Sequence, residues 1–206
     1  MDEPTILGFA AVSLAVIAVP GPSVVFAVNR AIASGRRIAL LTLLGNAAGL
    51  FVQVIFVAAG LGLIVTGSDR AYALLKLLGA AYLIWLGASA IRHRHHAAQA
   101  LWADAPSPTS RPWREGFVIG LTNPKSAVLL AALLPQYADR GTGLMAVQMA
   151  ALGGLFCLIA IASDGLWVTL AASCRGWFTR DPRRLGWAAA AGGLVMVTLG
   201  LALLAS

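Results

Sequence analysis

Charged residues are scarce in this 206-residue chain: Asp, Glu, Lys and Arg together make up 11% of it, against about 25% in a soluble domain. Hydrophobic residues account for 59%. A chain with so few polar side chains cannot cover a globular surface that faces water, so lipid is its expected outer solvent. The shortage of charge therefore favours a membrane protein over a soluble helical bundle.

The sequence also lacks the residues that several kinds of chemistry need. It has two cysteines, which would lie about 25 Å apart along one helix, so a disulfide framework or a redox pair is not expected. No segment fits the phosphate-binding pattern G-x-x-x-x-G-K-[ST], so energy from nucleotide hydrolysis is not expected either. No nucleotide, metal or other cofactor is predicted.

Histidine occurs only at positions 93, 95 and 96, in a polar connection, and not at membrane depth. An intramembrane nucleophile would therefore have no histidine base, and Asp164 has no second deep acid with which to form a protease pair. The apolar segments also lack a cluster of carboxylate, Cys or His ligands, which disfavours a metal-ion exporter. We interpret the three histidines as part of a solvated basic loop and predict no catalytic and no metal-binding residues.

The apolar residues fall into six stretches, each long enough for a helix to cross a bilayer, which takes roughly 20 residues. They are approximately 5–31, 38–66, 71–91, 114–136, 142–172 and 184–205. Stretches such as 71–91 lack the alternation over about 10 residues that marks the strand of a membrane β-barrel. The sequence therefore predicts an all-α polytopic membrane protein with six transmembrane helices.

Positive charge is placed unevenly along the chain, whose net charge is +7. Most arginines fall in the first, third and fifth connections: Arg30, Arg36, Arg37, Arg92, Arg94, Arg111, Arg114, Arg175, Arg180, Arg183 and Arg184. Because cytoplasmic loops accumulate Lys and Arg, these connections are predicted to be cytoplasmic and both termini periplasmic. We interpret the charge as a topology signal and predict no nucleic-acid partner. The acidic start Met1-Asp2-Glu3 does not fit a signal peptide, so the first stretch is predicted to be a retained helix.

Three segments of the first half resemble three of the second half in the same order. "PGPSVVFAV" from Pro20 matches "NPKSAVLLA" from Asn123, "AGLFV" from Ala48 matches "GGLFC" from Gly153, and "GAAYLIWLG" from Gly79 matches "GGLVMVTLG" from Gly192. We predict a first repeat over 1–91, a cytoplasmic linker over 92–113 and a second repeat over 114–206. An odd number of spans in each half inverts the second repeat, as in many secondary transporters, where one repeat would rock against the other.

Helix-breaking residues interrupt the first and fourth stretches at matching places. Pro20 and Pro22 flank Gly21, and Asn123, Pro124 and Lys125 stand together in the other half. A helix can break at membrane depth only where it faces protein or a wet cavity, so the two breaks are predicted to meet at one site. The half-helices starting at Ser23 and near Ser126 would direct unpaired N–H groups there, which favours an anion such as a carboxylate.

Two ionisable residues and two amides complete the candidate site. Lys125 would add positive charge, unless its side chain extends to the nearer membrane surface. Asp164 is the one acid deep in an apolar stretch; it either pairs with Lys125 structurally or binds a substrate ammonium, a proton, or both in turn. Asn46 and Gln53 share one helix face, where packing is the favoured role over ligand contact. The candidate substrate-binding residues are Pro20, Gly21, Pro22, Ser23, Asn46, Asn123, Pro124, Lys125, Ser126 and Asp164.

The segments at 20–23, 79–87 and 121–137, together with Asp164, closely resemble the LysE/RhtB family of bacterial amino-acid exporters. The resemblance implies efflux of amino acids or derivatives such as homoserine, homoserine lactone or threonine across the inner membrane, in exchange for protons. With a single deep acid, the chain is expected to prefer small neutral amino acids. The alternatives are an exporter of another solute or a metal ion, a passive channel, or an intramembrane enzyme. Glycine-rich third and sixth helices would be compatible with a homodimer.

Overall fold

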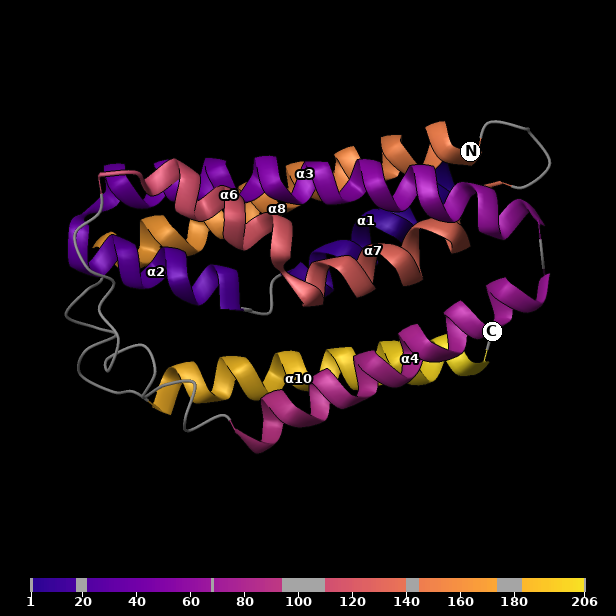
Figure 1. Ribbon diagram of the computed structural model, residues 1–206. Coiled ribbons are helices and arrows are strands. Elements are labelled where there is room, and N and C mark those ends of the chain that lie inside the picture. Colours follow the sequence, from indigo (N-terminus) through magenta and orange to yellow (C-terminus); the bar gives the residue numbers. More distant parts are fainter. Residues whose placement is uncertain are drawn as a thin grey trace.

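The computed structural model describes residues 2–17, 22–67, 69–93, 110–139, 145–173 and 183–205, and every regular element among them is an α-helix (Figure 1). The helices are α1 (Glu3–Ile17), α2 (Pro22–Ser34), α3 (Arg36–Gly67), α4 (Asp69–Arg92), α6 (Pro112–Thr122), α7 (Pro124–Tyr137), α8 (Met145–Ser173) and α10 (Arg183–Ala205). Over the described residues, each predicted apolar stretch is helical, with ends that agree to within a few residues.

The surface of this helical bundle is apolar. Phe56 is 70% exposed and Leu158 is 65% exposed, as suits side chains that contact lipid. Within the described residues, α3 and α8 are long and apolar enough to cross a membrane over Arg36–Gly60 and Met145–Leu170. The pair α6 and α7 meets the same criteria as one span bent by 50°. The chain is thus an all-helical membrane protein, while the count of six spans stays a prediction.

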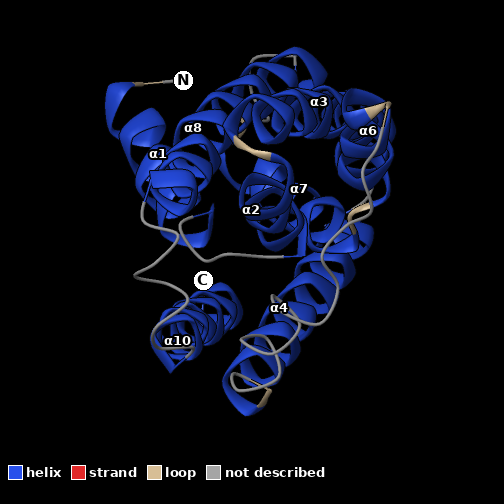
Figure 2. Cartoon of the chain, turned by 90° about the vertical axis from the view of Figure 1, so that its left-hand side faces the viewer, coloured by secondary structure: helices blue, strands red, loops and turns tan. Residues whose placement is uncertain are grey.

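The helices are layered around two short central ones. Figure 2 shows α2 and α7 between a layer that contains α3, α6 and α8 and a separate pair made of α4 and α10. The main hydrophobic core joins α1, α3, α4, α7 and α8 through buried side chains that include Phe9, Leu50, Leu83, Leu130 and Met149. Val24 and Val28 of α2 are buried in a smaller cluster. The two helices that follow the predicted breaks, α2 and α7, therefore lie inside the protein.

One end of the bundle collects the described ends of the arginine-rich connections. On the left of Figure 1, α2 and α4 end and α3, α6 and α10 begin. The arginines at these helix ends are Arg36, Arg37, Arg92, Arg111, Arg114, Arg183 and Arg184. Their common position agrees with the predicted grouping of the odd connections; Arg94, Arg175 and Arg180 lie outside the described residues.

Arg30 lies elsewhere than the sequence interpretation placed it. It belongs to α2, not to the first connection, and is 2% exposed. Its Nη2 donates to Oε2 of Glu115 on α6 at 2.5 Å, and its guanidinium carbon lies 5.1 Å from the centre of the Phe26 ring. A buried arginine requires such a partner, and this one is 85 residues away in sequence. Arg30 thus joins α2 to α6.

Glycines bring α3 and α6 into direct backbone contact. Gly45 and Gly49 on α3 face Gly116 and Gly120 on α6, so that a G-x-x-x-G pair lies on each side. A Cβ added at any of the four would overlap with a backbone carbonyl of the other helix. This is the close approach that such glycine pairs allow in membranes. These four glycines therefore set how closely α3 and α6 approach.

A second glycine contact joins α4 to α10. A Cβ at Gly87 of α4 would overlap with the carbonyl of Gly193 on α10 and approach the amide nitrogen of Val197 to 2.9 Å. At Gly200 of α10, a Cβ would lie 2.9 Å from the carbonyl oxygen of Ala80 on α4. These two helices therefore pack as one unit.

Candidate functional site

The α6–α7 break is built around Asn123. Helix α6 ends at Thr122, Asn123 is extended with φ −69° and ψ 108°, and α7 begins at Pro124. Oδ1 of Asn123 accepts a hydrogen bond from the backbone N–H of Lys125 at 3.0 Å, which makes Asn123 the N-cap of α7. The half-helix was predicted to begin near Ser126. An asparagine cap followed by proline in the first helical position is a recognised start signal, and it identifies Pro124 as the first residue.

Gln53 of α3 binds two backbone carbonyls at this break. Its Nε2 donates to the carbonyl of Leu121 at 2.7 Å and to the carbonyl of Asn123 at 3.1 Å. In a regular helix the Leu121 carbonyl would accept from Lys125, whose N–H is instead bound by the Asn123 side chain. Gln53 was interpreted as a packing residue. Its position two turns along α3 from Asn46, and so on the same face, was the available signal for a role at the site.

The two interrupted segments meet. Helix α1 ends at Ile17 and α2 begins at Pro22, while Pro20 and Gly21 lie outside the described residues. Nδ2 of Asn123 donates to Oγ of Ser23 at 3.3 Å, joining the start of α7 to the start of α2. Because both ends of its amide have protein partners, Asn123 connects the two half-helices in this conformation.

A small pocket lies where these helix starts converge, lined on its polar side by Ser23, Asn46, Asn123, Lys125, Ser126 and Asp164. The pocket has a volume of about 40 Å³, room for a few water molecules but not for an amino acid. Val16, Leu50 and Phe156 form part of its apolar wall. Pro22 begins α2 and Pro124 begins α7, and Pro124 does not line the pocket.

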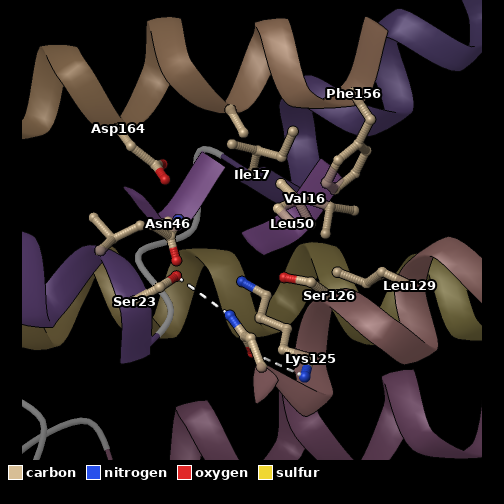
Figure 3. A pocket seen from close by; sticks show the side chains of 13 residues that line it. Val16, Ile17, Ser23, Asn46, Leu50, Lys125, Ser126, Leu129, Phe156 and Asp164 are labelled. Carbon is tan, nitrogen blue, oxygen red and sulfur yellow. Dashed lines mark hydrogen bonds between the residues drawn. The ribbon is translucent and has the colours of Figure 1, made fainter. Parts of the chain in front are cut away.

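Opposite charges enter this pocket from different helices. Lys125 on α7 is 8% exposed and Asp164 on α8 is 5% exposed. Figure 3 shows the Lys125 side chain running from the start of α7 toward Asn46, and the Asp164 carboxyl pointing into the same space from α8. Because Lys125 is buried in the pocket, it does not extend to the membrane surface, and that alternative is wrong for this conformation.

Two oxygen atoms at the pocket lack a hydrogen-bond donor. Within the described residues, Oδ1 of Asn46 and Oδ1 of Asp164 are buried without a partner. A buried polar atom left unsatisfied costs about 1–3 kcal/mol. A molecule that brings N–H donors would therefore be accepted here, and its own polar groups would determine how it is oriented.

The predicted histidine loop lies mostly outside the described residues. His93 ends the described part after α4, where its Nδ1 is 3.1 Å from the backbone oxygen of Ser89. His95 and His96 fall in the part that is not described. Over the described residues, no group of three or more His, Cys, Asp or Glu side chains could hold a metal ion.

Broken helices that meet at a buried, charged pocket define a helical membrane protein with an internal polar site. The model of the LysE type translocator family matches residues 14–206, and the chain belongs to this family. The family is one of translocators, which agrees with the prediction of a transporter and not an enzyme. No solved structure matches the chain.

Several bacterial proteins are similar in sequence. A homoserine/homoserine lactone efflux protein of Salmonella typhimurium is 37% identical over 121 residues, 57% of each chain. An uncharacterized membrane protein of Vibrio cholerae is 36% identical over 120 residues, 58% of each chain. The threonine efflux protein of Escherichia coli is 27% identical over 173 residues, 81% of this chain and 80% of that one. The chain thus spans less than two thirds of the first two relatives' length.

Proposed function

We propose that this protein is a secondary active exporter of small neutral amino acids or their derivatives, working by proton antiport. The observation that carries the proposal is the buried pocket between the starts of α2 and α7, which holds Lys125 and Asp164 together. Membership of a translocator family and the efflux activities named for the relatives support it.

The pocket suits a zwitterion. A substrate carboxylate would bind at the starts of α2 and α7, beside Ser23, Ser126 and the Lys125 ammonium, because helix starts and a cation both attract anions. The substrate ammonium would donate to Asp164 and to Oδ1 of Asn46, which supplies the donors that these oxygen atoms lack. One deep acid matches one ammonium, so a second positive charge on the substrate would have no partner.

Binding an amino acid requires the helices to separate, since the pocket is too small in this conformation. Alternating access would open it to one side and then to the other. Asp164 is our candidate for the proton-coupling group: it would release its proton when the ammonium binds and take up another when the substrate leaves.

The contact between α4 and α10 supports the inverted repeat. The sequence match pairs Gly79 with Gly192, an offset of 113 residues. With this offset, Gly87 of α4 corresponds to Gly200 of α10, and Gly193 and Val197 of α10 correspond to Ala80 and Ile84 of α4. A contact of Gly87 with Gly193 and Val197 therefore predicts a contact of Gly200 with Ala80 and Ile84. Both contacts occur in the structure. A Cβ on Gly87 would meet the carbonyl of Gly193 and the amide nitrogen of Val197, and a Cβ on Gly200 would meet the carbonyl of Ala80 and the amide nitrogen of Ile84. A two-fold axis between α4 and α10 would produce this exchange.

We further propose that the moving parts are not the two repeats. The glycine contacts join α3 of the first half to α6 of the second, and α4 of the first half to α10 of the second. Rocking one repeat against the other, as the sequence suggested, would break both backbone contacts. Motion of the short helices α2 and α7 between two fixed units, one formed by α3 and α6 and the other by α4 and α10, would keep them.

The remaining parts of the proposal concern the membrane. We propose six spans in the bacterial inner membrane, with the arginine-rich end of the bundle in the cytoplasm and both termini in the periplasm. We also propose that the protein forms a homodimer through the glycine-bearing helices α4 and α10. Lipid, protons and the amino acid are the expected partners, and no nucleic acid is.

Export from loaded proteoliposomes tests the function. Homoserine, threonine, leucine, lysine and glutamate would each be loaded as radiolabelled solutes, with and without an imposed proton gradient. We expect saturable export of the neutral compounds that accelerates when the outside is acidic. Flux that does not saturate would indicate a channel, faster export of lysine would refute the neutral preference, and rates independent of the gradient would refute proton antiport.

A further inference from the structure

A second cavity lies away from the central pocket, at the arginine-rich end of the bundle. It has a volume of about 610 Å³ and lies between α2 and the first turns of α6. Among the described residues, its lining combines Arg30, Arg111 and Arg114 with the carboxylate of Glu115. It shares no lining residue with the central pocket, so the proposed transport does not assign it a role.

The charges of this cavity favour an anion. Glu115 binds Arg30 at 2.5 Å, and the side chains of Arg111 and Arg114 are exposed beside this ion pair. Helix α6 also begins here: Arg111 is its N-cap residue, without a side-chain cap, and Pro112 follows in the first helical position. The start of a helix carries partial positive charge, which adds to that of the arginines.

The walls of the cavity become apolar one turn deeper. On α6, Val118 follows Arg114 by four residues and is 49% exposed. On α2, Phe26 precedes Arg30 by four residues, and its ring lies below the guanidinium. Each helix therefore places an apolar side chain about 6 Å along its axis from an arginine. A small soluble anion has no need of such a wall.

We propose that this cavity binds an anionic glycerophospholipid. Its phosphodiester would contact Arg111, Arg114 and the start of α6, and the upper part of an acyl chain would lie against Phe26 and Val118. Basic pockets between transmembrane helices bind anionic headgroups in this way. The bound lipid would hold the ends of α2 and α6 together beside the Arg30–Glu115 ion pair.

Native mass spectrometry of the purified full-length protein tests the proposal, with phosphatidylglycerol and phosphatidylcholine titrated separately. The test variant combines Arg111→Gln with Arg114→Gln. Both arginine side chains are exposed, so the fold should persist. The control is Arg92→Gln, an exposed arginine at the end of α4. We expect a preference for phosphatidylglycerol that the double variant weakens about thirtyfold and the control leaves unchanged.

Three results would overturn the lipid site. They are equal binding of the two lipids, an unchanged phosphatidylglycerol affinity in the double variant, or an equal loss in the control. Displacement of the lipid by millimolar inorganic phosphate would instead indicate a site for soluble anions. A thermal unfolding curve of the double variant that matches the parent would show that any lost binding comes from the missing charges.

Discussion

Replacing Gln53 with leucine tests how the break between α6 and α7 is maintained. The substitution introduces an apolar side chain of similar size and removes the donor that serves Leu121 and Asn123. The Asn123 carbonyl would keep a second partner, the N–H of Ala127 at 3.1 Å. The Leu121 carbonyl would lose the Gln53 donor.

The expected magnitude follows from that one carbonyl. An unsatisfied buried carbonyl costs about 1–3 kcal/mol, and interhelical hydrogen bonds measured in a membrane protein reach about 1.7 kcal/mol. We therefore expect Gln53→Leu to lower stability by about 1–2 kcal/mol. The same free energy acts against the broken conformation, so its population relative to a straightened helix should fall roughly 5–30-fold.

Thermal unfolding in detergent and export from proteoliposomes would measure the two effects. Thr42→Val on the same helix is a matched control, because the Thr42 hydroxyl is buried but donates to Ile38 within α3. A Pro124→Ala background adds a sharper comparison. Because alanine at position 124 restores a backbone N–H at the break, Gln53→Leu should lower stability less in the Pro124→Ala background than in the parent.

The reasoning would be refuted by two findings together: equal effects of Gln53→Leu and Thr42→Val on export, and no difference between the two backgrounds. Gln53 would then be an ordinary packing residue, as its sequence position first indicated.

Three further predictions follow from the same contacts. Lys125→Ala and Asp164→Asn should each leave expression intact but abolish export from proteoliposomes; undiminished transport by both would remove the site assignment. Gly120→Ala should destabilise the protein by about 1–3 kcal/mol in thermal unfolding, because its Cβ would overlap with α3, whereas Gly60→Ala, with nothing within 4 Å, should not. Arg30→Glu and Glu115→Arg should each lower the melting temperature, and the double exchange should restore part of the loss. The loss for Glu115→Arg should approach the about 3–5 kcal/mol of a broken buried pair, since Arg30 is 2% exposed and would lose its partner; a strictly additive double variant would argue against a direct pair.

Local sequence predicted the helices well because the controlling signals are local. Apolar runs set the helix lengths, and Pro124 identified the break in α6–α7 to within a few residues. Six of the seven candidate site residues whose side chains the structure describes line one pocket, because prolines at depth imply an internal position.

Contacts between distant segments could not be predicted in this way. Arg30 looks like a loop residue until Glu115, 85 positions later, is seen beside it. Gln53 has an apparent packing role until the carbonyl of Leu121, 68 positions later, is known to need a donor. The pairing of repeats across the glycine contacts is equally a property of the folded chain, and it changes which parts are free to move.

The hydrogen bond between Ser23 and Asn123 has a consequence for biogenesis. The two residues are 100 positions apart, so at about 5–20 residues per second the ribosome adds Asn123 roughly 5–20 s after Ser23. During that interval the start of α2 is in the nascent chain without its partner. A chain released before residue 123 would therefore leave the Ser23 hydroxyl at the start of α2 without its Asn123 donor, a feature by which membrane quality control could recognise truncated products.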